Sequence, residues 1–139
     1  LYMEGADYIF MNQETFDQHP IAHDLINGVD FLLEGAVLDV AVDIRKGSPT
    51  FGQYVSVELT GENHRQFFIP RGFAHGFSVL SEGMIFQYKC DNFYSPQSEG
   101  AIAWNDPDLN IDWRIPAEKV VLSEKDGKHP RLKDWQNVF

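Results

Sequence analysis

The sequence predicts an all-β protein, built as an antiparallel β-barrel or jelly roll. Three observations favour this fold: apolar and polar residues alternate with a period of two, the apolar runs are short and closely spaced, and helical patterns are scarce. Short strands at regular spacing are typical of barrels and sandwiches. With 139 residues, 43% of them hydrophobic, we expect a single domain, residues 1–139, with a substantial core.

The clearest alternation lies in residues 37–44. Four branched apolar side chains fall on one face of this predicted strand, and Asp39, Ala41 and Asp43 fall on the other, a pattern typical of a half-buried strand. Further strands are predicted at residues 7–11, 29–33, 54–59, 67–69, 76–80 and 84–90. Two short helical turns are predicted near the C-terminus, at residues 116–120 and 132–135.

Residues 65–77 form the segment that most favours a chemical role. A strand enters a Pro-x-Gly turn, in which Pro70 ends the ladder pairing and Gly72 allows a positive φ angle. The next strand then carries His75, which makes this imidazole a candidate for chemistry inside a barrel. The alternative is a structural histidine whose hydrogen bonds are satisfied.

Composition limits the kinds of molecule that this protein is expected to bind and the compartment in which we expect it. The net charge is −10, from 21 acidic and 11 basic residues, and this argues against nucleic acid, because phosphate backbones require clustered Lys and Arg. The one cysteine, Cys90, excludes an internal disulfide, and we expect it to be a buried small apolar residue. We find neither an apolar run of membrane-spanning length nor a signal-peptide pattern, so we expect a cytoplasmic protein with no membrane contact.

Charge is distributed unevenly along the chain. Residues 1–35 contain seven acids and no Lys or Arg, whereas residues 36–139 contain the other fourteen acids and all eleven bases. This break indicates two segments of different origin or role. The alternative is chance clustering of charge on a solvated face.

Several motifs occur in a specific order after the break. They are VLDVAVDIRKGSPTFG at residues 37–52, IPRGFAHGF at 69–77, YKC at 88–90, FYSP at 93–96, IAWNDP at 102–107, IDW at 111–113 and LSEKD at 122–126. From about residue 35 to the C-terminus the chain resembles the dTDP-4-dehydrorhamnose 3,5-epimerase family. That resemblance implies a cupin-type jelly roll and an isomerase of dTDP-rhamnose and carbohydrate biosynthesis.

The resemblance also implies catalytic roles for three residues. Tyr88 would return a proton to the sugar ring, His75 would lie beside the reacting sugar, and Asp126 would orient the catalytic base histidine. These roles suit epimerisation, because removal of a proton next to a ketone leaves an enolate that must be reprotonated on the opposite face. Without the resemblance, Tyr88 is an amphipathic core residue and Asp126 a turn aspartate.

The implied substrate is a dTDP-linked 4-keto-6-deoxyhexose, a nucleotide sugar. The resemblance implies that Phe93 or Tyr94 stacks on the nucleotide base, and Arg71 is a further candidate for substrate binding. We expect no cofactor and no metal, because the His-x-His pair of the first cupin motif is absent.

The first 35 residues depart from the epimerase pattern. The family's Arg-Gly-Leu-His block, which supplies the base, and its Ala-Gln-x-Lys-Leu stretch are both missing. Residues 1–35 are instead similar to the middle OB-type domain of bacterial elongation factor P, and the two resemblances meet at Glu34-Gly35-Ala36. We therefore interpret the chain as a chimera, with residues 1–35 foreign and 36–139 epimerase-like. His19 is the candidate for a substitute base, although strand alternation and Pro20 argue against it.

Three functions follow from these patterns. The first is a 3,5-epimerase whose activity is impaired because the base-histidine block is missing. The second is a catalytically inactive chimeric β-barrel scaffold, and the third is a translation-factor-like binding module, which the acidic N-terminal segment disfavours. The resemblance implies a dimer built by exchanging N-terminal strands, but those strands are the replaced part here. Exposed edges left by the replacement favour self-association, so a homodimer is a candidate assembly.

Overall fold

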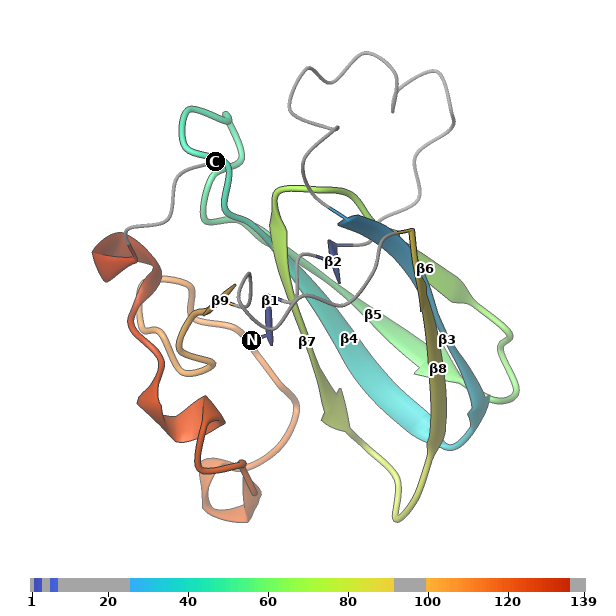
Figure 1. Ribbon diagram of the computed structural model, residues 1–139. Coiled ribbons are helices and arrows are strands. Elements are labelled where there is room, and N and C mark those ends of the chain that lie inside the picture. Colours follow the sequence, from blue (N-terminus) through green and yellow to red (C-terminus); the bar gives the residue numbers. More distant parts are fainter. Residues whose placement is uncertain (1, 4–5, 8–25, 92–99, 136–139) are drawn as a thin grey trace.

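Two facing β-sheets and a C-terminal segment of short turns make up the protein (Figure 1). The computed structural model describes residues 2–3, 6–7, 26–91 and 100–135. Its strands are β1 (Tyr2–Met3), β2 (Ala6–Asp7), β3 (Ile26–Glu34), β4 (Ala36–Asp43), β5 (Tyr54–Thr60), β6 (Gln66–Ile69), β7 (Phe73–Val79), β8 (Ile85–Cys90) and β9 (Gly100–Ala101). Three 3₁₀ turns follow, η2 (Ala117–Lys119), η3 (Asp126–Lys128) and η4 (Leu132–Asp134).

The described residues confirm the predicted fold class, all-β with short C-terminal helical turns. One sheet has the strand order β5-β4-β7-β1-β9, and in the other β3 pairs with β2, β6 and β8. The pairs that β4 forms with β5 and β7, and β3 with β6 and β8, are antiparallel. The predicted strand at residues 7–11 is described only at Asp7, and its remainder lies outside the described residues.

Gly35 is the corner at which the chain passes from one sheet to the other. Its φ angle is +85°, in the region that favours glycine. A Cβ at this position would lie 2.3 Å from the carbonyl oxygen of Gly83 and 2.7 Å from Ser81 Oγ. The predicted break between the two segments therefore coincides with a change of sheet.

Both faces of β4 are covered, so our prediction of a half-buried strand at residues 37–44 is wrong. One face packs into a cluster with the C-terminal segment: Leu38, Val40, Val42, Ile44, Ala74, Ile102, Leu109 and Leu132. On the other face, Val37 and Ala41 pack with Leu32 of β3 and Phe67 of β6. The aspartates of that face, Asp39 and Asp43, are therefore enclosed between the sheets rather than exposed to solvent.

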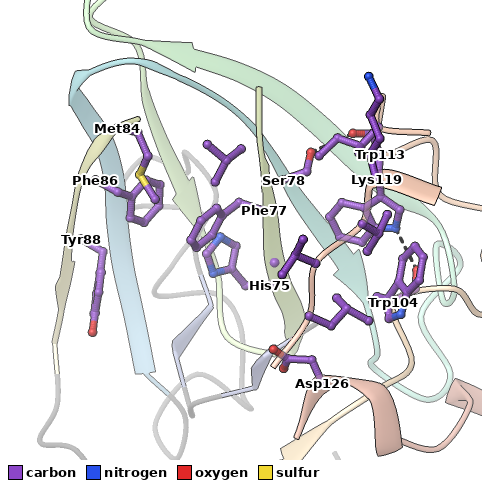
Figure 2. A pocket seen from close by; sticks show the side chains of 16 residues that line it. His75, Phe77, Ser78, Met84, Phe86, Tyr88, Trp104, Trp113, Lys119 and Asp126 are labelled. Carbon is purple, nitrogen blue, oxygen red and sulfur yellow. Dashed lines mark hydrogen bonds between the residues drawn. The ribbon is translucent and has the colours of Figure 1, made fainter. Parts of the chain in front are cut away.

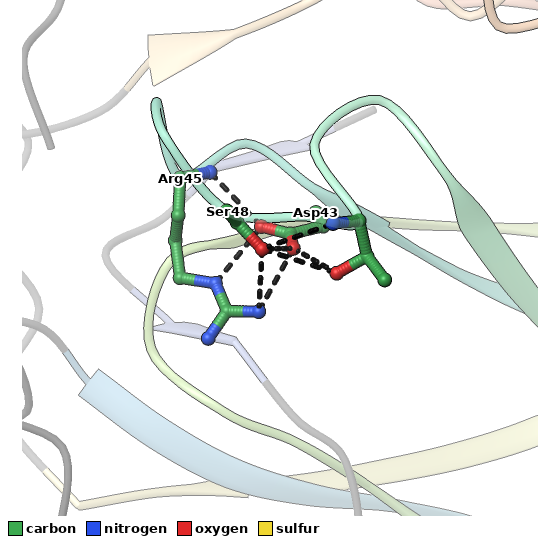
Figure 3. A network of polar contacts seen from close by, with 4 residues as sticks. Asp43, Arg45 and Ser48 are labelled. Atoms are coloured by element: carbon green, nitrogen blue, oxygen red, sulfur yellow. Dashed lines mark hydrogen bonds and ion pairs between the residues drawn. The ribbon is translucent and has the colours of Figure 1, made fainter.

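The turn after β4 closes on Asp43 (Figure 3). Arg45 donates to this carboxylate from Nε at 2.9 Å and from Nη2 at 2.8 Å. The hydroxyls of Ser48 and Thr50 each donate to Oδ2 at 2.6 Å. The Arg45 guanidinium also lies 4.7 Å from the centre of the Phe73 ring. This network fixes the start of the β4–β5 connection beside the Pro-x-Gly turn that precedes β7. In that turn Gly72 has a φ angle of +90°, which confirms the predicted positive φ.

Candidate functional site

A pocket of about 720 Å³ lies between β7, β8 and the C-terminal segment (Figure 2). Its walls are mainly apolar and aromatic, with Phe77, Phe86, Trp104 and Trp113 among the lining residues. The rings of Phe77 and Phe86 stack at 4.6 Å between centroids, so they join β7 of one sheet to β8 of the other. Apolar pockets of this size, with a few polar groups, are typical of small-molecule sites.

The three residues proposed for catalysis all line this pocket. His75 and Tyr88 reach it from opposite sheets, and Asp126 reaches it from η3. The His75 ring lies 6.4 Å from Phe77, and the Tyr88 ring lies 6.4 Å from Phe86. Two stacked phenylalanines therefore bridge the imidazole and the phenol.

Strand register determines where these two side chains lie. His75 pairs with Ala41 of β4, and Tyr88 pairs with Asp30 of β3. Tyr88 is 55% exposed, so its phenol meets solvent at the mouth of the pocket rather than packing in the core. Our alternative, that Tyr88 is an amphipathic core residue, is therefore wrong.

His75 contacts two buried carboxylates that we did not predict. Its Nε2 atom lies 2.5 Å from Asp39 Oδ1 and 2.9 Å from Asp30 Oδ2. Both aspartates have no exposed surface. His75 is thus held by polar partners, as the structural alternative predicted, and it also lines the pocket.

The two carboxylates determine the charge of His75. Burial alone would lower the pKa of this imidazole, but the charge of Asp39, followed by contacts with Asp30, raises the pKa to about 10. Burial raises the pKa of Asp39 to about 6, with His75 opposing that rise and Asp30 adding to it. At neutral pH the imidazole is therefore a cation that faces the pocket.

Asp126 occupies the turn position that the sequence predicts, with a histidine nearby. Its Oδ2 accepts a hydrogen bond from Ser123 Oγ at 2.6 Å. The Nε2 atom of His129, one turn onward, lies 3.6 Å from Asp126 Oδ1. An imidazole thus lies beside Asp126, but it comes from the C-terminal segment and not from the N-terminal block that holds the base in the epimerase family.

The remaining predicted residues lie elsewhere. Arg71 forms an ion pair with Asp91 at 2.8 Å and is not among the pocket-lining residues. Phe93, Tyr94 and His19 lie outside the described residues. Cys90 is exposed, so the prediction that it is buried is wrong; it lies near the end of β8, a strand whose side chains are mostly accessible.

Sequence reasoning missed Asp30 and Asp39, although one signal pointed to them. Aspartate is depleted in strands, yet Asp30 lies in one predicted strand and both Asp39 and Asp43 in another. An acidic residue at such a position requires either solvent or a specific partner. That conflict between residue type and element was a usable sign of a buried polar site.

The fold and the pocket define a jelly roll of the cupin type with one ligand-sized cavity described between its sheets and its C-terminal segment. The sequence profile described as dTDP-4-dehydrorhamnose 3,5-epimerase matches residues 28–134. The chain therefore belongs to the dTDP-4-dehydrorhamnose 3,5-epimerase family, as the motifs predicted. The profile of the elongation factor P OB domain matches residues 1–49, so the chain is also similar to that domain over its first third.

Relatives of known name support this assignment. The dTDP-4-dehydrorhamnose 3,5-epimerase of Pseudomonas aeruginosa is 58% identical over 100 residues, covering 72% of this chain and 55% of the relative. The Legionella pneumophila dTDP-6-deoxy-D-glucose-3,5-epimerase, solved with dTDP-4-keto-L-rhamnose, is 52% identical with a TM-score of 0.77, over 81% of this chain and 60% of that one. The Sulfolobus tokodaii dTDP-4-dehydrorhamnose 3,5-epimerase is 35% identical with a TM-score of 0.75, over 100% of this chain and 72% of that one.

The chain spans about half the length of the curated relatives it matches, between 53% and 56% for three of them. Among the described residues, no helix has the length and apolar character required to cross a membrane.

Proposed function

We propose that this chain is a nucleotide-sugar isomerase that epimerises a dTDP-linked 4-keto-6-deoxyhexose at C3 and C5. The observation that supports the proposal best is the meeting of His75, Tyr88 and Asp126 at one pocket in a member of the epimerase family. A solved relative carries dTDP-4-keto-L-rhamnose. The pocket volume, about 720 Å³, is in the range of sites that bind ligands of drug size.

The proposed chemistry is proton removal, enolate formation and proton return. A base removes the proton on the carbon next to the C4 ketone, and the electron pair moves onto the keto oxygen. The cationic His75 stabilises that oxyanion. Tyr88 then donates its phenolic proton to the opposite face of the ring, and the resulting phenolate takes a proton from solvent.

The weak points of the proposed enzyme are the base and the diphosphate contacts. The base-histidine block of the family is missing from the sequence, so proton removal is slow compared with family members that contain the block. Lys119 is the lysine among the lining residues of the described pocket, in a chain with net charge −10. We therefore propose reduced activity together with weak nucleotide binding.

Incorporation of solvent deuterium tests the activity directly. The keto-sugar nucleotide is incubated with the protein in D₂O, and deuterium at C3 and C5 is followed by NMR. We expect slow incorporation that Tyr88→Phe reduces at least tenfold, whereas Tyr54→Phe, which alters a phenol outside the pocket, has no effect. Absence of the label in sugar treated with folded wild-type protein would rule out the epimerase.

The second candidate function is an inactive chimeric scaffold that retains nucleotide binding. The missing base block favours it. Saturating dTDP should then raise the melting temperature without any deuterium incorporation, because a ligand that binds only the folded state stabilises it. An unchanged melting temperature would remove the binding claim as well. The translation-factor-like module has only the match to residues 1–49 in its favour.

The proposal extends to assembly and location. Among the described strands β8 pairs only with β3, and Ile85 and Tyr88 on β8 are 49% and 55% exposed. Exposed apolar and aromatic side chains on one strand favour contact with a second copy, which supports a homodimer that sedimentation can test. The single cysteine favours a reducing, cytoplasmic location.

A further inference from the structure

Asp126 supplies the one carboxylate among the described residues that line the pocket. The titratable side chains of that lining are His75, Tyr88, Lys119 and Asp126. Figure 2 shows the Asp126 carboxylate directed toward the side of the pocket on which His75 and Tyr88 lie. Because Asp126 comes from η3 and Tyr88 from β8, a carboxylate and a phenol reach the pocket from different walls.

The hydrogen bonds of the Asp126 carboxylate leave one oxygen available. Its Oδ2 atom accepts a hydrogen bond from Ser123 Oγ at 2.6 Å. Its Oδ1 atom is buried, and none of the described residues donates a hydrogen bond to it. The Nε2 atom of His129 lies 3.6 Å from this oxygen, beyond hydrogen-bond length. Buried oxygens without donors are rare, but an oxygen that takes up a carbon-bound proton cannot be occupied by a permanent donor.

The other titratable groups of this lining are poorly suited to remove a proton. His75 is a cation at neutral pH, and an ammonium group such as that of Lys119 carries donors and no acceptor. Tyr88 is the proton donor of the proposed reaction. His129 is not among the lining residues. Within the described lining, the carboxylate is therefore the group that can act as a base.

We infer that Asp126 is itself the catalytic base of this chain and takes the proton from the carbon next to the C4 ketone, an inference that rests on the proposed function. The C–H bond breaks, a carboxylate oxygen forms an O–H bond, and the electron pair moves onto the keto oxygen. Tyr88 then protonates the opposite face of the ring, and Asp126 returns its proton to solvent.

The side chain has the freedom that this role requires. It is 24% exposed, and the torsion about its Cβ–Cγ bond has a broad energy minimum. Rotation about that bond can therefore present either oxygen to the sugar without a change in the η3 backbone. The single hydrogen bond from Ser123 keeps the carboxylate beside the pocket during this rotation.

Deuterium incorporation at C3 and C5 in D₂O tests the inference, because the label enters only after the C–H bond has broken. We expect Asp126→Asn to slow incorporation at least about a hundredfold, since the amide keeps the shape of the side chain but cannot take up the proton. The control Asp108→Asn removes the same charge from an exposed ion pair with Lys133 and should react as wild type. Circular dichroism establishes that each variant is folded.

Two further measurements separate a base from a structural residue. His129→Gln should slow incorporation by less than about tenfold, because a neighbour that transfers no proton contributes less than a base. Formate added to Asp126→Ala should restore part of the lost rate, because a small carboxylate can fill the vacated space and accept the proton. Chloride at the same ionic strength should restore none.

Three results in an active wild-type protein would overturn the inference alone. Incorporation by Asp126→Asn at the wild-type rate would place the base elsewhere. Loss of incorporation in His129→Gln would make the imidazole the base and Asp126 its positioning residue. Failure of formate to restore any rate in folded Asp126→Ala would leave Asp126 a structural role. Absence of incorporation by the wild type would instead remove the proposed function and this inference together.

Discussion

Asp39 and Asp43 lie on the same face of β4, four residues apart, and both are buried, at 0% and 1% exposure. Asp43 accepts hydrogen bonds from the backbone N–H of Arg45, from two guanidinium nitrogens, and from the hydroxyls of Ser48 and Thr50. Asp39 contacts His75 through one oxygen, and its other oxygen has no described donor. These two aspartates lie on the same face of one strand, yet the carboxylate of Asp43 is fully hydrogen-bonded and that of Asp39 is not.

The difference follows from where the partners lie in the sequence. All the donors to the Asp43 carboxylate come from residues 45–50. The turn that follows β4 therefore supplies by itself the hydrogen bonds that this buried charge requires. The partners of Asp39 come from β7 and β3, and they bring a second carboxylate with them. A buried charge with complete local bonding stabilises structure, whereas one with incomplete long-range bonding is typical of a functional site.

Removal of Asp43 is expected to have the largest effect on stability. Asp43→Ala removes the carboxylate that pairs with the Arg45 guanidinium, at 17% exposure, and that accepts hydrogen bonds from two hydroxyls. Loss of one partner of a buried pair costs about 3–5 kcal/mol. Urea denaturation at pH 7 measures this, and a loss below about 1 kcal/mol would contradict the structural role of the network.

Acid should weaken the contribution of Asp43 in a defined range of pH. Burial alone would raise the pKa of this carboxyl, but hydrogen bonds from Arg45, then Ser48 and Thr50, hold the pKa well below its ordinary value of 3.8. Because the folded-state pKa is the lower one, the stabilisation is complete above pH 3.8 and is lost as the pH falls through that value toward the folded-state pKa.

The difference in unfolding free energy between wild type and Asp43→Asn isolates this effect. We expect that difference to be constant from pH 7 to about pH 5 and to shrink below about pH 4, as the Asp43 carboxylate of the unfolded wild-type chain takes up a proton while that of the folded protein stays ionised. Other titrating groups are common to both proteins, so their contributions cancel. A difference that stays constant down to pH 3 would contradict the pKa assignment.

Replacement of Asp39 should be milder, because His75 retains Asp30. We expect Asp39→Asn to cost about 1–2 kcal/mol in unfolding free energy, since the amide keeps the shape and one acceptor of the carboxylate. The pKa of His75 should fall, because the charge of Asp39 is the largest contribution that raises it. Titration of the imidazole carbon shifts by NMR measures this, and an unchanged His75 pKa would show that Asp39 is not its partner.

The same two aspartates show how far the sequence could be interpreted. Alternation in residues 37–44 correctly located β4 and put Asp39 and Asp43 on one face, and motifs brought His75, Tyr88 and Asp126 to one pocket. Alternation cannot tell whether the polar face meets solvent or another sheet, because that depends on where β3 packs. Asp30 was therefore missed: an aspartate in a strand signals a buried polar site, but the partners of Asp30 depend on contacts between β3, β4 and β7, which the local pattern does not give.

The smallest expected effect tests whether the bonding of Asp43 is additive. Ser48→Ala removes one of the donors to Asp43 Oδ2, but Thr50 and Arg45 still bond to that oxygen. We therefore expect a loss of about 1 kcal/mol, the net value of a single hydrogen bond to a carboxylate that keeps its other partners. Urea denaturation of Ser48→Ala in the wild-type and Asp43→Asn backgrounds completes a double-mutant cycle. The cost should decrease in the second background; an equal cost in both would mean that Ser48 stabilises the turn independently of Asp43, and that local bonding does not explain how this buried charge is accommodated.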